Sequence, residues 1–195
     1  MSSDESIKLV AGLGNPGSQY EATRHNVGYW LVDELARKYN GHFKNESKFK
    51  GEVAKIHVGG QDVWLIKPST FMNLSGQSVS ALARFYKIQP EQVLVVHDEL
   101  DLDPGVARLK SGGGHGGHNG LRDVSEKMGK NYWRIRLGIG HPGHKSQVAD
   151  YVLKKPSQDD RISLERAIDD ALGVIELALT GDQERAMHLL HTNKR

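Results

Sequence analysis

The stretch Ile7–Gly17, IKLVAGLGNPG, sets the fold of this 195-residue chain. Its first half, Ile7–Leu13, is mostly apolar and predicts a buried β-strand. Its second half is a glycine turn that formally matches the dinucleotide-binding pattern G-x-G-x-x-G. Ligands of open α/β sheets bind outside the carboxyl ends of the strands, so the turn delivers Asn15 to a position where a ligand would bind.

The residues after this turn argue against a nicotinamide or flavin cofactor. Such a cofactor needs a helix that opens within the glycine turn, whereas the next helical spacing begins about ten residues later, over Val27–Tyr39. The acid that would bind the ribose should end a second strand, yet Asp33 and Glu34 fall inside that helix. We therefore expect no nicotinamide or flavin cofactor at this turn, and a nucleotide-dependent oxidoreductase stays the weaker hypothesis.

Strands and helices alternate along the rest of the chain. A β-hairpin is predicted around Gly59-Gly60-Gln61, and Gly181 is expected to close the last long apolar helix. The other predicted elements are helices over Ser75–Tyr86, Leu121–Met128 and from Ser157 onward, and strands over Val93–Val96 and Trp133–Ile139. This order predicts one α/β domain over residues 1–195, a layered sandwich with a mixed, largely parallel twisted sheet and helices on both faces. Residues 1–6 are expected to form a disordered tail.

The amino-acid composition excludes several kinds of catalytic and binding site. Cysteine is absent, which removes disulfides, thiolate metal sites and a cysteine nucleophile, so His, Asp, Asn, Ser or backbone groups must act. No stretch approaches the roughly 20 apolar residues of a membrane span, and the first residues lack the features of a signal peptide. We expect a cytoplasmic monomer that contacts no membrane.

One segment is locally basic although the formal net charge is only +2. Between Val106 and Gln147 there are eight Lys or Arg residues against two acids, with four histidines in addition. This excess favours a polyanionic partner. The alternative is a solvated basic face that serves solubility.

His25 and Asp98 are the candidate pair for acid–base chemistry. Asp98 follows the strand Val93–Val96, so it can hold one ring nitrogen of His25 protonated and leave the other free to take a proton from water. The alternative interpretations are that His25 or Asn26 merely caps the following helix, and that Asp98 is an ordinary carboxylate in an acidic turn.

Two loops complete the candidate site. In Lys67–Gly76, Asn73 could hold a substrate carbonyl or cap a helix, while Phe71 and Met72 would offer an apolar contact surface. Gly112–Gly120 has six glycines in nine positions, which favours close backbone approach to an anionic oxygen, or a flexible lid. Its histidines, together with His141 and His144, also raise a metal hypothesis. Their loop spacing matches no H-E-x-x-H pattern, so we expect no metal.

Four blocks taken together resemble the bacterial peptidyl-tRNA hydrolases. They are Gly12–Gly28, Lys67–Asn73, His97–Asp101 and Gly112–Gly120, in order and at family-like intervals. The resemblance runs from about Ile7 to His188 and is far more specific than the glycine turn alone. It implies hydrolysis of the ester between a peptide and the terminal ribose of tRNA, which recycles stalled peptidyl-tRNA without metal or organic cofactor.

The resemblance also implies roles for single residues. His25 matches the family's catalytic base and Asp98 the carboxylate that orients it. Asn119 matches an asparagine proposed to position the attacking water. Further substrate-binding positions in the family are matched by Asn15, Tyr20, Met72, Asn73 and His118, and the positions associated with tRNA phosphates by Arg108, Lys110 and Arg136. A non-catalytic RNA-binding module is the remaining alternative, but only Tyr132 and Trp133 supply aromatic groups within the basic segment.

Overall fold

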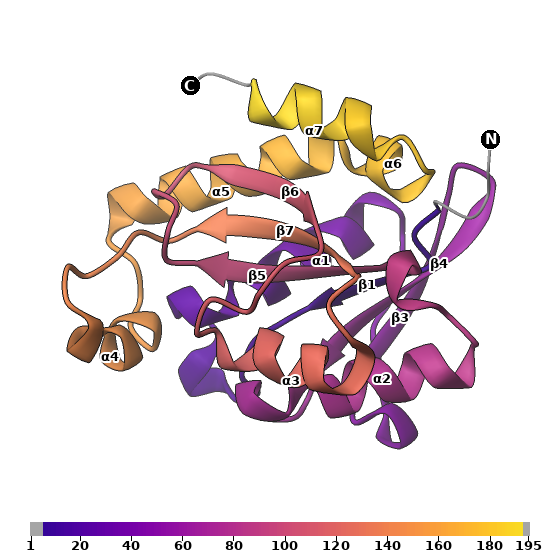
Figure 1. The fold of residues 1–195 in the computed structure, drawn as a ribbon, viewed down its shortest axis with the longest axis horizontal. Helices are drawn as coiled ribbons and strands as arrows, with labels where there is room; N and C mark the ends of the chain where they lie inside the picture. The colour runs from indigo at the N-terminus through magenta and orange to yellow at the C-terminus, as the bar shows by residue number, and fades with distance from the viewer. Residues whose placement is uncertain (1–5, 193–195) are drawn as a thin grey trace.

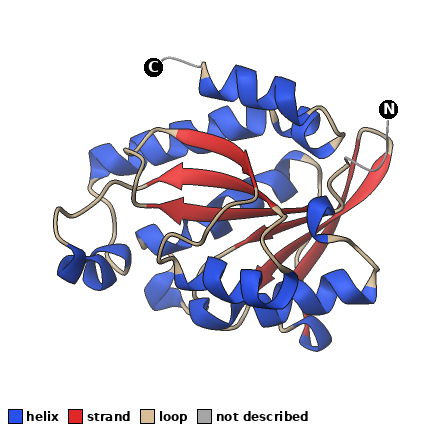
Figure 2. Cartoon of the chain, in the orientation of Figure 1, coloured by secondary structure: helices blue, strands red, loops and turns tan. Residues whose placement is uncertain are grey.

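The computed structural model describes residues 6–192, which form one mixed sheet between two layers of helices (Figures 1 and 2). The strand order is β2-β3-β4-β1-β5-β7-β6. The strands are β1 Leu9–Gly12, β2 Lys44–Glu46, β3 Gly51–Val58, β4 Gln61–Pro68, β5 Val93–Glu99, β6 Ala107–Ser111 and β7 Trp133–Gly138. The helices are α1 Val27–Lys38, α2 Ser75–Phe85, α3 Asn119–Met128, α4 Val148–Val152, α5 Gln158–Gly173, α6 Ile175–Leu179 and α7 Gln183–His191.

The centre of the sheet is parallel and both edges are antiparallel. β1 pairs in parallel with β4 and β5, and β5 pairs in parallel with β7. β3 runs antiparallel to β4, β2 to β3, and β6 to β7. This arrangement confirms the predicted mixed α/β sandwich, with the parallel pairing confined to the four central strands.

Alternating side chains of the central strands pack into two separate hydrophobic cores, one on each face of the sheet. Val10 of β1 and Leu94 of β5 belong to the core under α1, α5, α6 and α7, whereas Leu9 and Val95 belong to the core under α2 and α3. Figure 1 shows α5 and α7 along one side of the sheet and α2 and α3 along the other. Burial on both faces explains why these strands read as continuous apolar runs.

Two glycines bring α1 close to the sheet. A Cβ at Gly12 would lie 2.4 Å from the carbonyl oxygen of Gly28, and a Cβ at Gly28 would lie 2.5 Å from that of Val96. Neither position has room for a side chain. The first glycine of the predicted turn therefore serves helix packing, and α1 begins only at Val27, as the sequence predicted.

Several predicted elements need correction. Strand β6, Ala107–Ser111, was not predicted, and α3 begins at Asn119 rather than Leu121. The last long apolar helix is broken at Val174 into α5 and α6. Of the predicted N-terminal tail, residues 1–5 lie outside the described residues, and Ser6 is buried.

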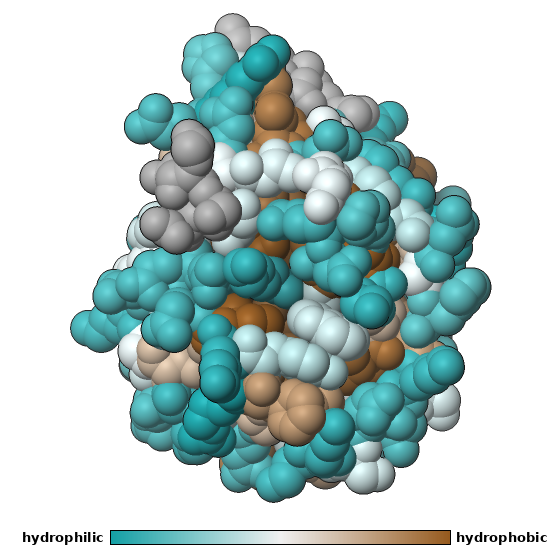
Figure 3. All heavy atoms as spheres, turned by 90° about the vertical axis from the view of Figure 1, so that its right-hand side faces the viewer, coloured by the Kyte–Doolittle hydropathy of each residue, from teal (hydrophilic) through white to brown (hydrophobic). Residues whose placement is uncertain are grey.

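The strand directions place the two ends of the sheet on opposite sides of the molecule. In Figure 1 the arrows of β5 and β7 point to the left, so the right-hand side is the amino end of these strands. Figure 3 views that side, where hydrophobic side chains show between hydrophilic ones. Among the described residues, we find no helix with the length and apolar character that crossing a membrane requires.

Candidate functional site

His25 and Asp98 meet at the carboxyl end of β5, as predicted. His25 lies in a single turn of 3-10 helix, Arg24–Asn26, that leads into α1, and Asp98 is the last but one residue of β5. His25 Nδ1 lies 2.8 Å from Asp98 Oδ2. A carboxylate oxygen accepts, so His25 donates from Nδ1 and its Nε2 keeps a free lone pair.

His118 contacts the other oxygen of the same carboxylate. Its Nε2 lies 2.7 Å from Asp98 Oδ1, while its Nδ1 accepts hydrogen bonds from the backbone N–H groups of Gly120 and Leu121. His118 therefore donates from Nε2 and caps the start of α3 with Nδ1. The rings of His25 and His118 have centroids 5.1 Å apart. We predicted His118 only as a residue lining the cleft, and its contact with Asp98 was missed.

Asp98 is ionised although it is 4% exposed. Burial raises the pKa of its carboxyl, but the charges and hydrogen bonds of His25 and His118 outweigh burial and hold that pKa well below its usual range. For His25, burial lowers the pKa, and the charge and hydrogen bond of Asp98 outweigh this effect and raise it. The pair thus has the electrostatics of a general base held by a carboxylate.

A cavity of about 420 Å³ opens onto this cluster. The glycine-rich loop and α3 form one wall with His115 and Asn119, and α4 forms another with Val148 and Val152. His25, Asp98 and His118 also line it. The cavity therefore brings apolar side chains, the Asn119 amide and His25 to one space.

The turn that carries Asn15 is held by side-chain amides. Asn26 accepts from the backbone N–H of Asn15 with its Oδ1 and donates to the carbonyl of Asn15 with its Nδ2, each at 2.9 Å. Asn15 Oδ1 accepts from the backbone N–H of Met72 at 2.7 Å. Asn26 stands at the N-cap of α1 without a side-chain cap hydrogen bond, and its side chain clamps the turn instead. The carbonyl of the Asn15 side chain is already used within the protein.

The other predicted substrate residues lie on the two flanking loops. Phe71 is 56% exposed, and its ring meets that of Tyr20 edge to face at 6.4 Å between centroids. Met72 is buried beside Asn15. Asn73 is exposed within a short 3-10 turn and does not cap α2, whose N-cap is Leu74.

The predicted phosphate contacts share one face of the β6–β7 edge. Arg108 is directly opposite Arg136 across the ladder, and Lys110 is opposite Arg134. Residues opposite each other, or two apart in a strand, point to the same face, so these four cations are grouped. Arg136 donates from Nε to Glu99 at 2.9 Å.

Arg134 ties the glycine-rich loop to this basic face. It is buried on β7 and donates from its guanidinium to the carbonyls of Gly113 and Gly114, the latter at 2.7 Å. The sequence places Arg134 in the basic segment but indicates no role for it. The sequence feature that could have indicated a role for Arg134 is its position in the predicted strand, two residues before Arg136 and therefore on the same face.

The histidines of the metal hypothesis do not gather around one point. His115 and His141 each accept a backbone N–H two residues further on, and His144 accepts that of Ser146. Within residues 6–192, the group with ligand atoms close enough to hold an ion is His25, Asp98 and His118, whose atoms lie within 4.8 Å of one another. In this group, the nearest ligand atoms are already joined by the hydrogen bonds of His25 and His118 to the Asp98 carboxylate.

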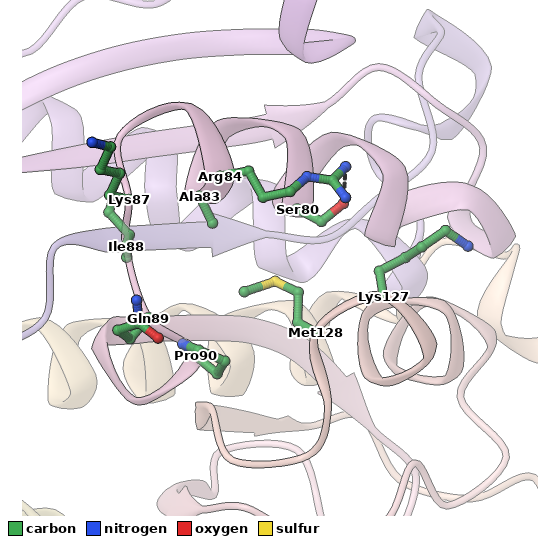
Figure 4. Close-up of a pocket in the computed structure, with 9 residues that line it drawn as sticks. All are labelled: Ser80, Ala83, Arg84, Lys87, Ile88, Gln89, Pro90, Lys127 and Met128. Carbon is green, nitrogen blue, oxygen red and sulfur yellow. Dashed lines mark hydrogen bonds between the residues drawn. The ribbon is translucent and has the colours of Figure 1, made fainter.

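A second hollow, of about 520 Å³, lies at the far end of α3 from His118. Figure 4 shows that its cationic side chains do not converge, because the ammonium groups of Lys87 and Lys127 lie at opposite sides of the view and Arg84 turns toward Ser80. Met128 lies between them. None of the predicted site residues lines this hollow.

Comparison with known proteins assigns the family. A model of the peptidyl-tRNA hydrolase family matches residues 9–195. The peptidyl-tRNA hydrolase of Halorhodospira halophila is 57% identical over 186 residues, which cover 95% of this chain and 96% of that protein. That of Stenotrophomonas maltophilia is 56% identical over 189 residues, covering 96% and 98%.

A solved structure supports the same assignment. The crystal structure of peptidyl-tRNA hydrolase from Acinetobacter baumannii superposes with a TM-score of 0.95 at 48% identity, covering 100% of this chain and 98% of that one. Sequence and fold agree over nearly the full length, which confirms the resemblance stated from the four sequence blocks. The chain therefore belongs to the peptidyl-tRNA hydrolase family and is a hydrolase.

Proposed function

We propose that this protein hydrolyses the ester bond between the peptide and the terminal ribose of peptidyl-tRNA, and so returns stalled or prematurely released tRNA to use. The observation that carries the proposal is that His25 lines a cavity while its Nδ1 is held by Asp98 at 2.8 Å, which leaves Nε2 as the nitrogen that can take a proton. Family membership supports the choice of substrate.

His25 acts as the general base. Its Nε2 removes a proton from a water molecule as the water oxygen attacks the ester carbonyl carbon, and the tetrahedral intermediate carries the negative charge on the former carbonyl oxygen. The bond from carbon to the ribose oxygen then breaks, and the imidazolium returns the proton to that oxygen. Asp98 keeps the proton on Nδ1 and stabilises the imidazolium, and so acts as a positioning residue.

Amide side chains hold the substrate and the water. Asn119, in the first turn of α3 and on the cavity wall, positions the attacking water. Asn73 is exposed and free to bind a peptide carbonyl or N–H, while Asn15 offers its Nδ2, because its Oδ1 is already bonded to Met72. Neutral amides grip any peptide backbone, so we expect broad tolerance of peptide sequence.

The remaining contacts extend from this centre. Tyr20, Phe71, Met72 and His118 line the path of the substrate, and Arg108, Lys110 and Arg136 bind phosphates of the tRNA. Lys110 lies at the glycine-rich loop, since a Cβ at Gly113 would meet its Nζ at 2.9 Å. The basic face therefore lies next to the loop that borders the cavity, which suits a substrate that joins a peptide to a polyanion.

A hydrolysis assay tests the reaction itself. The purified protein is incubated with an N-acetylated aminoacyl-tRNA, with and without a metal chelator, and the released tRNA and acyl amino acid are separated. We expect stoichiometric release of both products at equal rates in the two samples. Release of neither product, or release only when metal is restored, would contradict the proposal.

We further propose that the protein works as a cytoplasmic monomer. The absence of cysteine suits a reducing compartment, and translation supplies the substrate there. Sedimentation of the protein at micromolar concentration should give the mass of a single 21.6 kDa chain.

A further inference from the structure

His97 is a buried histidine next to Asp98 for which the mechanism above has no use. It is 1% exposed, and its Nδ1 lies 2.8 Å from the backbone carbonyl oxygen of Asp98. A carbonyl oxygen only accepts, so His97 is protonated on Nδ1 and its Nε2 is bare. This Nε2 is buried without a hydrogen-bond partner. A leucine would fill the position without an unpaired nitrogen, which indicates that the Nδ1–H group itself has a purpose.

The backbone carbonyl of Asp98, which His97 binds, points toward the β1 side of β5. At this position the pairing of β1 with β5 has already ended. In a parallel ladder, successive residues direct their backbone groups alternately to the two neighbouring strands. Val96 accepts from Leu13 on the β1 side, and Glu99 accepts from Ile139 on the β7 side. The carbonyl of Asp98, two residues after Val96, therefore points to the β1 side. The pairing of β1 with β5 ends at Gly12 opposite Val96, so β1 offers Asp98 no donor.

Because β1 ends before Asp98, His97 supplies the hydrogen-bond donor for the Asp98 carbonyl. Its ring also packs edge to face on that of His118, with centroids 5.3 Å apart. The backbone of Asp98 is thus fixed by one histidine, and its carboxylate is shared by two others. A rotation of this peptide unit would move both carboxylate oxygens away from His25 and His118.

We propose that His97 is a positioning residue for hydrolysis, which holds the backbone of Asp98 beyond the end of β1 and thereby keeps the carboxylate aligned with His25. The inference rests on the proposed role of His25 as the base. Burial lowers the pKa of His97 to about 3, so the ring adds no charge beside Asp98 at neutral pH. The ionisable groups that act on His97 are His118, Asp98 and Arg134, and Asp98 is the charged group that acts on His25.

Two substitutions separate this role from simple packing. His97→Asn keeps an N–H group near the place of Nδ1, whereas His97→Leu keeps the bulk and removes the donor. We expect the Leu variant to lose about tenfold in kcat/KM, the size of one lost hydrogen bond, and the Asn variant to lose less than about threefold. The pKa of His25, followed by NMR in the free protein, should fall in the Leu variant and stay at its wild-type value in the Asn variant.

A folded Leu variant with wild-type kcat/KM and a wild-type pKa of His25 would overturn the proposal, and so would an Asn variant as impaired as the Leu variant. If the Leu variant does not fold, His97→Gln replaces it, because its amide sits at the place of Nε2 and should behave as a loss of the donor. The NMR titration needs no substrate, so it separates this inference from the proposed function. An inactive His25→Ala protein with an unmoved His25 pKa in the Leu variant would refute the role of His97 alone.

Discussion

His25 donates from Nδ1 to Asp98 across 2.8 Å, and this single bond fixes which nitrogen of the ring can act as a base. The second oxygen of the same carboxylate is taken by His118 at 2.7 Å. With both oxygens bonded, Asp98 cannot rotate without breaking a charge-assisted hydrogen bond. The orientation of the His25 ring is therefore fixed in the free protein.

The activity should fall on the acid side with a midpoint above the ordinary histidine value. As the proposed base, His25 acts only when neutral, and its pKa is raised because Asp98 outweighs the effect of burial. A plot of kcat/KM against pH should therefore have its acid limb centred above about 6.5. A limb centred below that value would contradict the assignment of His25 as the base.

Asp98→Asn should move that limb to lower pH. The substitution removes the charge that raises the pKa of His25 and leaves burial, which lowers it. We expect activity to fall, but by less than in His25→Ala, since the base remains. Asp62→Asn is a matched control, because Asp62 contacts His57 in an exposed ion pair. The same shift in both variants would mean that the carboxylate of Asp98 has no special effect.

The strands and helices of the core could be predicted from the sequence because burial requires apolar residues at regular positions. Val93–Val96 is continuously apolar since β5 is covered on both faces, and α1 was placed to within a residue by its apolar spacing. Strand β6 was missed although Ala107 and Leu109 alternate with polar residues, because five residues at a sheet edge carry little signal. The spacing of apolar residues does not indicate the break between α5 and α6 at Val174.

Only part of the candidate site could be predicted in the same way. The meeting of His25 with Asp98 follows from a strand end beside a loop, so the sequence predicted it. The contact of His118 with Asp98 depends on the path of a loop with six glycines, which Arg134 holds by its carbonyls. Such a path has no periodicity to read. The proposed role of His97 depends on where β1 stops relative to β5, and the apolar pattern of the sequence does not define such a boundary to the residue.

His118 should show separable effects on stability and activity. His118→Asn keeps a side chain that caps helices well but cannot reach Asp98, whereas His118→Ala loses both functions. Thermal unfolding should show the Ala variant less stable than the Asn variant by about 1 kcal/mol. Both variants should lose activity to a similar degree. A fully active Ala variant would show that the contact with Asp98 is dispensable.

The basic face should govern binding and its dependence on salt. Replacing Arg108 and Lys110 with Ala should raise KM, leave kcat nearly unchanged and reduce the log–log salt slope by about 1.4, or about 0.7 for each lost contact. The matched control replaces Lys44 and Lys55, which are exposed on β2 and β3 at the opposite edge of the sheet. An equal change in both double variants would indicate a general charge effect and remove this face from the tRNA path.

Acid should destabilise the protein through His97. The pKa of His97 is about 3 in the folded protein and about 6.5 in the unfolded chain, so between these values the unfolded chain alone takes up the proton. Stability is therefore lost as pH falls, by up to about 1.4 kcal/mol per pH unit. Urea unfolding between about pH 6 and pH 4 should show this slope in the wild type and a flatter one in His97→Asn. Substitution of the exposed His42 should leave the slope unchanged.

Single-turnover hydrolysis by His25→Ala tests the central claim most directly. Enzyme in excess over a peptidyl-tRNA, with a chelator present, isolates the chemical step from product release. We expect the folded variant to bind the substrate with a Kd near that of the wild type and to hydrolyse it at least about 10²-fold to 10⁴-fold more slowly, the usual contribution of a general base. A folded His25→Ala protein that cleaves the ester at the wild-type rate would contradict the account.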